Sequence, residues 1–205
     1  MSGRRFDLRG LAEGQGPSRR HVASVVDVAE EIVVQGPVQA LAAVLARLWR
    51  TERLPAVPVG WEPADDVAST GLARSLGIGA GGERELPLVR DDHGGVLLAN
   101  GRLTAFGEQR KVLSRRFGAQ AYCDDSRVAD GPVTRIDVHP DWTATDQLTV
   151  AVVTLPLRPV QRAIGRALQI ASEPAQVLRD GVPFDREVTK WTWYADDRVR
   201  WRLRP

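Results

Sequence analysis

The spacing of apolar residues divides this chain into a helical first quarter and a strand-rich remainder. Apolar residues recur at helical intervals from Val22 to Val33, behind a candidate N-cap at Ser18, and predict a helix. Gly36-Pro37 breaks the pattern, and the broad apolar stripe of Val38–Arg50 predicts a second helix. Because the break is short, we expect the two to form an N-terminal helical hairpin.

The remaining patterns favour an antiparallel sheet with helices packed on it. The predicted elements are a short helix near 66–76, a hairpin of 86–89 with 96–99, a helix over about 104–117, a strand pair of 133–138 with 148–155, and a helix over 160–171. Asp180-Gly181 is a turn signal. This order predicts an α+β fold with a mainly antiparallel sheet, not a doubly wound one.

The chain end alternates between two residue types. Tryptophan and arginine follow a period of two through residues 186–204, which predicts a C-terminal β-hairpin with a loop at Ala195-Asp196-Asp197. In that register Trp191, Trp193 and Trp201 share one face and the arginines share the other. A shift of one residue would expose the core-facing side chains, so burial favours this register.

The domain organisation follows from these elements. Residues 1–17 lack an apolar period and are expected to be a flexible arm, while 18–205 form a single α+β domain with a helical subregion at 18–53. Apolar residues make up 43% and charged residues 26%, as is usual for globular proteins. No apolar run approaches the roughly 20 residues that span a bilayer, and no signal peptide is evident. The predicted compartment is the cytoplasm, which the single cysteine, Cys123, also fits.

Positive charge is concentrated in two segments, although the net charge is only +2. Only two of the 28 basic residues are lysines, a bias typical of GC-rich bacterial genomes. Clustered basic side chains can bind phosphates or acidic proteins. The alternatives are edge protection by charge on the terminal strand and a solvated helix face. The candidate partner-binding residues are Arg198, Arg200, Arg202, Arg204, Arg110, Lys111 and Arg115.

Paired carboxylates offer one candidate metal site. Four Asp-Asp doublets occur, and in Asp91-Asp92-His93 an imidazole joins the carboxylates, a set that could hold Mg²⁺ for phosphoryl transfer. All four doublets lie in predicted turns, where aspartate is favoured for hydrogen bonding to its own backbone. The turn interpretation therefore competes with the metal site.

A histidine at the end of a predicted strand offers a second chemical site. Asp137 and His139 are two residues apart and so share a face, as a general base and its orienting carboxylate would. The sequence contains no Gly-x-Ser-x-Gly nucleophile to accompany them. The alternative is a strand-end histidine that hydrogen bonds to its neighbours.

The leading hypothesis is therefore a non-catalytic cytoplasmic binding protein with a protein or nucleic-acid partner and no membrane contact. The alternative is a small hydrolase or a metal-dependent phosphoryl-transfer enzyme that uses Asp91, Asp92 and His93, or Asp137 and His139. The sequence predicts no cofactor, and it leaves the question of catalysis and the oligomeric state open.

Overall fold

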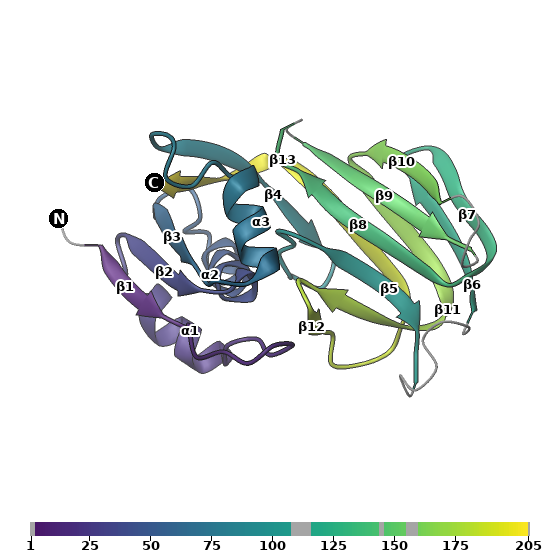
Figure 1. Ribbon diagram of the computed structural model, residues 1–205, viewed down its shortest axis with the longest axis horizontal. Coiled ribbons are helices and arrows are strands. Elements are labelled where there is room, and N and C mark those ends of the chain that lie inside the picture. Colours follow the sequence, from purple (N-terminus) through teal and green to yellow (C-terminus); the bar gives the residue numbers. More distant parts are fainter. Residues whose placement is uncertain (1–2, 108–115, 144–145, 155–159, 205) are drawn as a thin grey trace.

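A mixed sheet dominates the protein in the computed structural model, which describes residues 3–107, 116–143, 146–154 and 160–204 (Figure 1). The described residues form three helices, α1 (Arg19–Val26), α2 (Val38–Arg50) and α3 (Val67–Ser75). None of these helices is long and apolar enough to cross a bilayer. The sheet has thirteen strands, and its main path runs β1-β2-β3-β13-β11-β5-β8-β9-β10.

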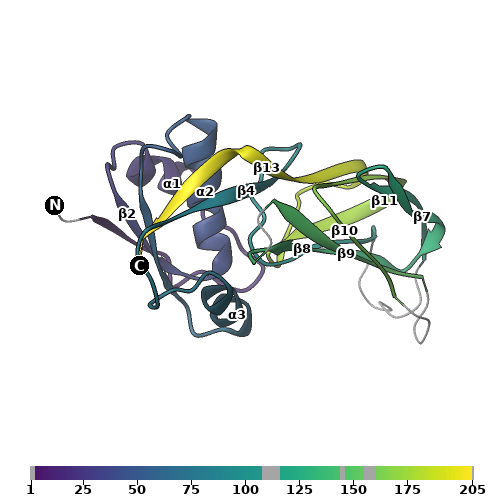
Figure 2. The same ribbon diagram turned by 90° about the horizontal axis from the view of Figure 1, so that it is seen from above.

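The first part of the chain forms a parallel layer with helices. Strands β1 (Arg4–Asp7), β2 (Ile32–Gly36) and β3 (Val59–Pro63) pair in parallel, and β3 pairs in parallel with the end of β13 (Val188–Arg204). Helices α1 and α2 pack on these strands (Figure 2), and Leu72 and Leu76 at the buried side of α3 join the same apolar core. This region is therefore a small α/β layer.

The rest of the chain is antiparallel. It contains β4 (Arg84–Asp91), β5 (Gly101–Ala105), β6 (Phe117–Cys123), β7 (Ser126–Val133), β8 (Arg135–Asp141), β9 (Gln147–Val153), β10 (Gln161–Gly165), β11 (Ala167–Arg179) and β12 (Val182–Pro183). The long strand β11 pairs with β13, β5, β6 and β12. These strands curl around a second apolar core, separate from the core beneath the helices.

Strand β13 belongs to both cores. Its first half places Trp191 and Trp193 in the core of the antiparallel strands, and its second half places Trp201 and Leu203 in the core beneath the helices. All three tryptophans are at most 1% exposed, so the prediction that they face the interior is confirmed. Figure 2 shows the strand running from the helical part of the molecule into the antiparallel part.

Several predicted elements are confirmed. Helix α2 begins and ends where its apolar stripe does. Ser18 caps α1 by accepting a hydrogen bond from the His21 N–H at 3.2 Å. The predicted helix near 66–76 is α3, and β8 pairs with β9 as expected.

The predicted fold class is wrong, because the structure is mostly a mixed sheet with three short helices. The N-terminal helical hairpin does not exist: Ile32 and Val33 belong to β2, a strand between α1 and α2. The terminal segment is one strand, with an irregularity at Asp196–Arg200 in place of a hairpin loop.

Three further predictions also need correction. Residues 160–171 contribute to β10 and β11 instead of a helix. The expected flexible arm contains β1, which pairs with β2. Thr104 lies in β5 and Phe117 in β6, while residues 108–115 of the predicted helix lie outside the described part of the chain.

Candidate functional site

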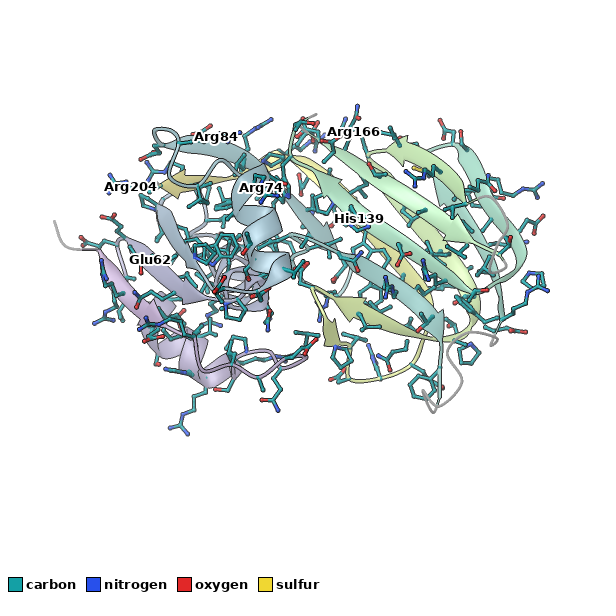
Figure 3. The ribbon with its side chains drawn as sticks, viewed as in Figure 1. Glu62, Arg74, Arg84, His139, Arg166 and Arg204 are labelled. Atoms are coloured by element: carbon teal, nitrogen blue, oxygen red, sulfur yellow. The ribbon has the colours of Figure 1, made fainter. Side chains whose placement is uncertain are left out.

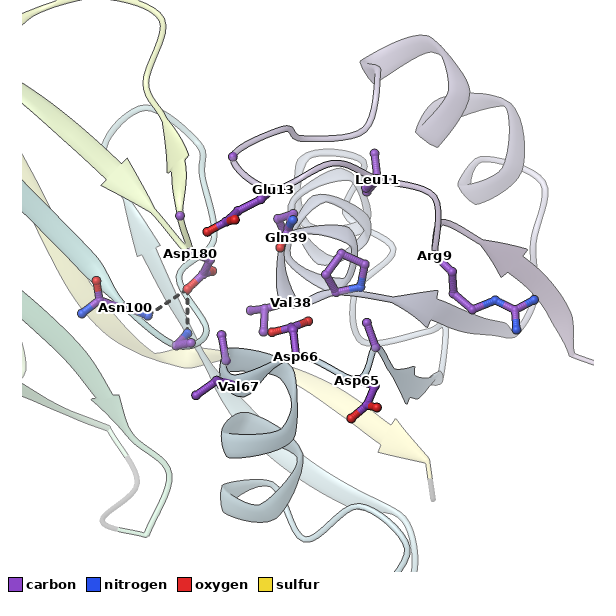
Figure 4. Close-up of a pocket in the computed structure, with 16 residues that line it drawn as sticks. Arg9, Leu11, Glu13, Val38, Gln39, Asp65, Asp66, Val67, Asn100 and Asp180 are labelled. Atoms are coloured by element: carbon purple, nitrogen blue, oxygen red, sulfur yellow. Dashed lines mark hydrogen bonds between the residues drawn. The ribbon is translucent and has the colours of Figure 1, made fainter. Parts of the chain in front are cut away.

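A cavity of about 590 Å³ opens at the carboxyl ends of the three parallel strands (Figure 4). It is lined by Arg9 and Leu11 after β1, by 37–39 after β2, and by 64–68 after β3. The carboxyl edge of parallel strands is where open α/β sheets bind their ligands. The topology therefore points to this cavity, called here the strand-end cleft, as the candidate site.

The opposite wall of the strand-end cleft comes from the antiparallel strands. It consists of Ala99 and Asn100 before β5 and of Asp180 and Gly181 at the turn between β11 and β12. Glu13 and Gly14 close one side. The cleft thus lies between the two cores, as sites between structural units often do.

Two helices begin at the cleft. Pro37 gives α2 no side-chain cap, but the Val38 N–H donates to Ser69 Oγ at 3.2 Å. The Ser69 hydroxyl in turn donates to Asp66 Oδ2 at 2.6 Å, and Asp66 caps α3 by accepting from the Ser69 N–H at 2.8 Å. Ser69 is completely buried, so this chain of hydrogen bonds links the two helix starts. Both helix starts therefore border the cleft, and Asp66 already caps the positive end of α3.

Gly36 makes the turn into α2. Its φ is +145°, and an added Cβ would lie 2.9 Å from the carbonyl carbon and oxygen of Leu8. The Gly36 carbonyl accepts hydrogen bonds from Trp61 Nε1 at 2.9 Å and from the Ala64 N–H at 3.1 Å. A residue without a side chain is thus required where the chain enters the cleft.

Carboxylates dominate the polar lining, and two of them are committed to the backbone. Asp66 caps α3, and Asp180 accepts hydrogen bonds from the N–H groups of Leu98, Ala99 and Asn100 at 2.7–3.0 Å. Burial raises the pKa of Asp180, and these three N–H groups partly oppose that rise. Asp180 therefore holds the 98–100 turn against the cleft.

The other charged side chains of the lining differ in whether they already bind a partner within the protein. Arg9 binds Asp7 through two hydrogen bonds of 3.0 and 2.6 Å, which lowers the pKa of Asp7 to about 2. Glu13 and Asp65 are exposed and carry no hydrogen bond or ion pair within the described part of the chain. They are the carboxylates of the lining that remain available to a ligand.

The structure places the Asp91-Asp92-His93 candidate outside the cleft. Asp91 is 1% exposed and accepts from the N–H groups of His93 and Gly95, both at 2.9 Å, while Arg179 donates to it at 3.1 Å. The His93 ring packs 4.6 Å from that of Trp191, and its Nε2 lies 3.6 Å from Asp92. The described residues contain no cluster of three or more potential metal ligands. Asp91 therefore shapes a turn.

Asp137 and His139 share a face of β8, as the spacing predicts, but no hydrogen bond joins them within the described residues. Asp137 is held by Arg102 Nε at 2.6 Å and Arg135 Nε at 2.7 Å. The exposed His139 ring lies 3.1 Å from the Ala99 oxygen and 3.2 Å from Asn100 Nδ2, so it is next to the cleft wall (Figure 3).

The predicted arginine surface on β13 is largely occupied by contacts within the chain. Arg202 reaches Glu83 at 3.4 Å and Arg204 reaches Glu31 at 2.6 Å. Arg200 lies 3.6 Å from Asp146, and the backbone N–H of Arg198 donates to Asp196. Arg110, Lys111 and Arg115 lie outside the described residues.

Sequence reasoning missed the strand-end cleft as a site. Two of its signals were visible, the Asp65-Asp66 doublet and the Asp180-Gly181 turn, and both were interpreted as ordinary turn chemistry. Nothing in the sequence alone relates position 66 to position 180. The parallel pairing of β1, β2 and β3 gathers the residues of one wall, and the antiparallel strands bring Asp180 to the opposite wall.

Comparisons with known proteins concern the fold. No family model matches the sequence, and no curated protein matches it. Among solved structures, a diacylglycerol kinase from Bacillus anthracis str. Sterne superposes with a TM-score of 0.67 at 11% identity, over 94% of this chain and 83% of the other. An NAD kinase from Archaeoglobus fulgidus in complex with ATP superposes with a TM-score of 0.56 at 12% identity, over 93% and 82%.

This likeness corrects the leading functional hypothesis. The sequence shows no coherent catalytic set and so favours a non-catalytic binding protein, yet the two structures that superpose above are kinases. The enzyme alternative is the better supported of the two readings. At these identities the likeness establishes the architecture: the chain has the fold of diacylglycerol and NAD kinases.

Proposed function

We propose that this protein is a phosphoryl-transfer enzyme of the kinase type, which binds a nucleoside triphosphate and an alcohol acceptor in the strand-end cleft. The observation that carries the proposal is the convergence of three strand ends and two helix starts on one cavity of about 590 Å³. A cavity of this size accommodates a nucleotide-sized ligand. The kinase folds that superpose on the chain support the same reaction class.

The phosphates would lie at the starts of α2 and α3. Catalysis of phosphoryl transfer is largely positioning and charge stabilisation, and helix N-termini supply both through oriented backbone N–H groups. Arg9 is engaged by Asp7 and is the only basic side chain that the described lining contains. The backbone of the two helix starts would therefore make most of the phosphate contacts.

Divalent-cation chemistry fits the donor set of the cleft. Mg²⁺ is usually bound through one or two carboxylates together with substrate phosphates, so a three-residue cluster is not required. Asp65 and Glu13 are the carboxylates that could hold it, and the ion would neutralise phosphate charge. Asp65 lies directly before the N-cap of α3 and would accept the proton of an acceptor hydroxyl if Glu13 held the ion.

The test is transfer of label from radioactive ATP in Mg²⁺ to diacylglycerol in mixed micelles and, separately, to NAD. We expect labelled product with one of these acceptors. Asp65→Asn should lower the rate by about 10²-fold or more, the contribution typical of a proton acceptor. Asp125→Asn changes an exposed carboxylate in the β6–β7 turn and should leave the rate unchanged.

The possible results of the labelling assay either support or refute the proposal. Transfer that is lost in Asp65→Asn and kept in Asp125→Asn supports the proposal. Wild-type protein that binds no Mg²⁺-ATP, or that binds it and labels neither acceptor, would refute it. Activity that is indifferent to Asp65→Asn would remove the role assigned to that carboxylate.

A further inference from the structure

A group of four arginines, Arg50 and three others whose charges act on it, lies apart from the lining of the strand-end cleft. Its members are Arg19 of α1, Arg47 and Arg50 of α2, and Arg179 at the end of β11. Burial lowers the pKa of Arg50, and the positive charges of the other three lower it further. Arg50 is therefore near enough to the other three to be repelled by them, and Asp91 offsets part of that repulsion.

Two of these arginines lie against consecutive glycines in the turn after β4. Arg50 Cδ and Nε are 3.8 and 3.9 Å from the point where a Cβ on Gly94 would stand. Arg179 Nη1 is 1.5 Å from the corresponding point on Gly95, so any side chain there would displace it. The Gly94-Gly95 turn thus allows the two arginine side chains to pack side by side on the backbone.

Within the described part of the chain, two of the four arginines form ion pairs with carboxylates. Arg47 forms a bidentate ion pair with Asp27, and Arg179 donates a hydrogen bond to the buried Asp91 at 3.1 Å. Arg50 Nε donates to the carbonyl of Ala46 at 3.1 Å. Neither Arg50 nor Arg19 forms an ion pair within the described part of the chain.

We propose that Arg19, Arg50 and Arg179 form a binding site for a phosphate-bearing anion, distinct from the strand-end cleft. Guanidinium groups bind phosphate oxygens in pairs, and they are less strongly hydrated than lysine, which suits a partly buried anion site. An anion among three like charges would offset their mutual repulsion. Asp91 accepts from Nη1 of Arg179, whose guanidinium also lies 5.3 and 6.0 Å from the ring centroids of Phe184 and Trp191, and 24% of the Arg179 side chain is exposed to an anion.

The proposed anion site is adjacent in sequence to a wall of the strand-end cleft. Arg179 is followed by Asp180, whose carboxylate holds the 98–100 turn that forms the cleft wall. An anion on Arg179 therefore binds one residue away from a wall of the cleft. The proposal does not depend on phosphoryl transfer, because it concerns side chains that the cleft lining does not include.

The experiment measures anion binding by the full-length chain in two forms. Isothermal titration with inorganic phosphate tests a free anion, and co-sedimentation with phosphatidylcholine vesicles, with and without phosphatidic acid, tests a lipid headgroup. Arg19→Gln and Arg50→Gln should each weaken binding by about tenfold, the loss expected for one charged hydrogen bond. Arg20→Gln, the exposed neighbour on α1, is the matched control and should bind as the wild type does. Raising the salt concentration should weaken binding.

Each result bears on the proposal. Saturable phosphate binding that both variants weaken supports a free anion, and binding only to vesicles with phosphatidic acid that both variants weaken supports a headgroup. No binding in either form, or binding that Arg20→Gln weakens as much as Arg50→Gln, overturns it. Arg19 is exposed and lacks an ion pair, so Arg19→Gln should unfold at the wild-type urea concentration and keep the test valid.

Discussion

The turn from β2 into α2 depends on Gly36, and replacing it with alanine tests whether the cleft is built as described. The φ of +145° is one that residues with side chains rarely adopt. The new Cβ would stand 2.9 Å from two backbone atoms of Leu8. Those atoms cannot rotate away as a flexible side chain could, so β1 and β2 would have to separate locally.

The magnitude follows from two additive costs. A residue held in this backbone region is strained by about 1–3 kcal/mol, and overpacking costs about 1–3 kcal/mol more. Gly36→Ala should therefore lower the free energy of unfolding by about 2–6 kcal/mol. Gly71→Ala is the matched control, because Gly71 lies inside α3 with open space around its Cα. Alanine there should stabilise the protein by about 0.5–1 kcal/mol through helix propensity.

The assay is urea unfolding of both variants and the wild type, followed by far-ultraviolet circular dichroism. We expect midpoints that move in opposite directions with similar slopes. A Gly36→Ala protein within about 0.5 kcal/mol of the wild type would refute the reasoning, since surface changes alone produce differences of that size. Weaker ATP binding by Gly36→Ala would be expected as well, because Pro37 and Val38 line the cleft directly after it.

Three further predictions concern carboxylates. Asp7 should titrate at about pH 2 by NMR, and Arg9→Gln should return its pKa toward 3.8 because the guanidinium holds it down. Asp91→Ala should cost about 3–5 kcal/mol in urea unfolding, because it leaves the Arg179 charge without its buried partner. Burial raises the pKa of Asp180 above 3.8, so the folded state holds this proton more tightly than the unfolded state. The free energy of unfolding of the wild type, measured relative to that of Asp180→Asn, should therefore fall as pH rises above about 3.8. Urea unfolding of both proteins across pH measures this difference.

Helices were predictable where a broad apolar stripe had clear ends, and α2 is the example. The failures occurred where short apolar runs fit two periods. Ile32 and Val33 continue the helical spacing of the preceding segment, yet Ile32, Val33 and Val34 are also a β-branched run typical of a buried strand. In β11, Leu168 and Ile170 are buried while Gln169 and Ala171 are exposed, a period of two that the helical interpretation overlooked.

The site was harder to predict than the fold for a physical reason. Its carboxylates are Glu13, Asp65, Asp66 and Asp180, and each is an unremarkable turn or loop residue in its own sequence neighbourhood. Their significance comes from parallel pairing, which requires connections that return every strand in the same direction. The predicted antiparallel neighbours would put successive strand ends at opposite edges of the sheet, so the sequence pattern predicts no shared edge for these residues.

The alternation of tryptophan and arginine in β13 correctly predicted buried tryptophans, but the hairpin loop predicted within it is wrong. Asp196 and Asp197 indicated a loop, but Asp196 is an ion-pair partner of Arg90 at 2.8 Å, with only 11% of its side chain exposed. The Arg90 guanidinium lies between the rings of Trp49 and Tyr194, 4.5 and 4.2 Å from their centroids. The irregularity at this point is a bend, which a strand needs when it passes from one core to another. Because β13 continues through that bend, it joins the α/β layer to the antiparallel strands and contributes side chains to both of the cores that flank the cleft.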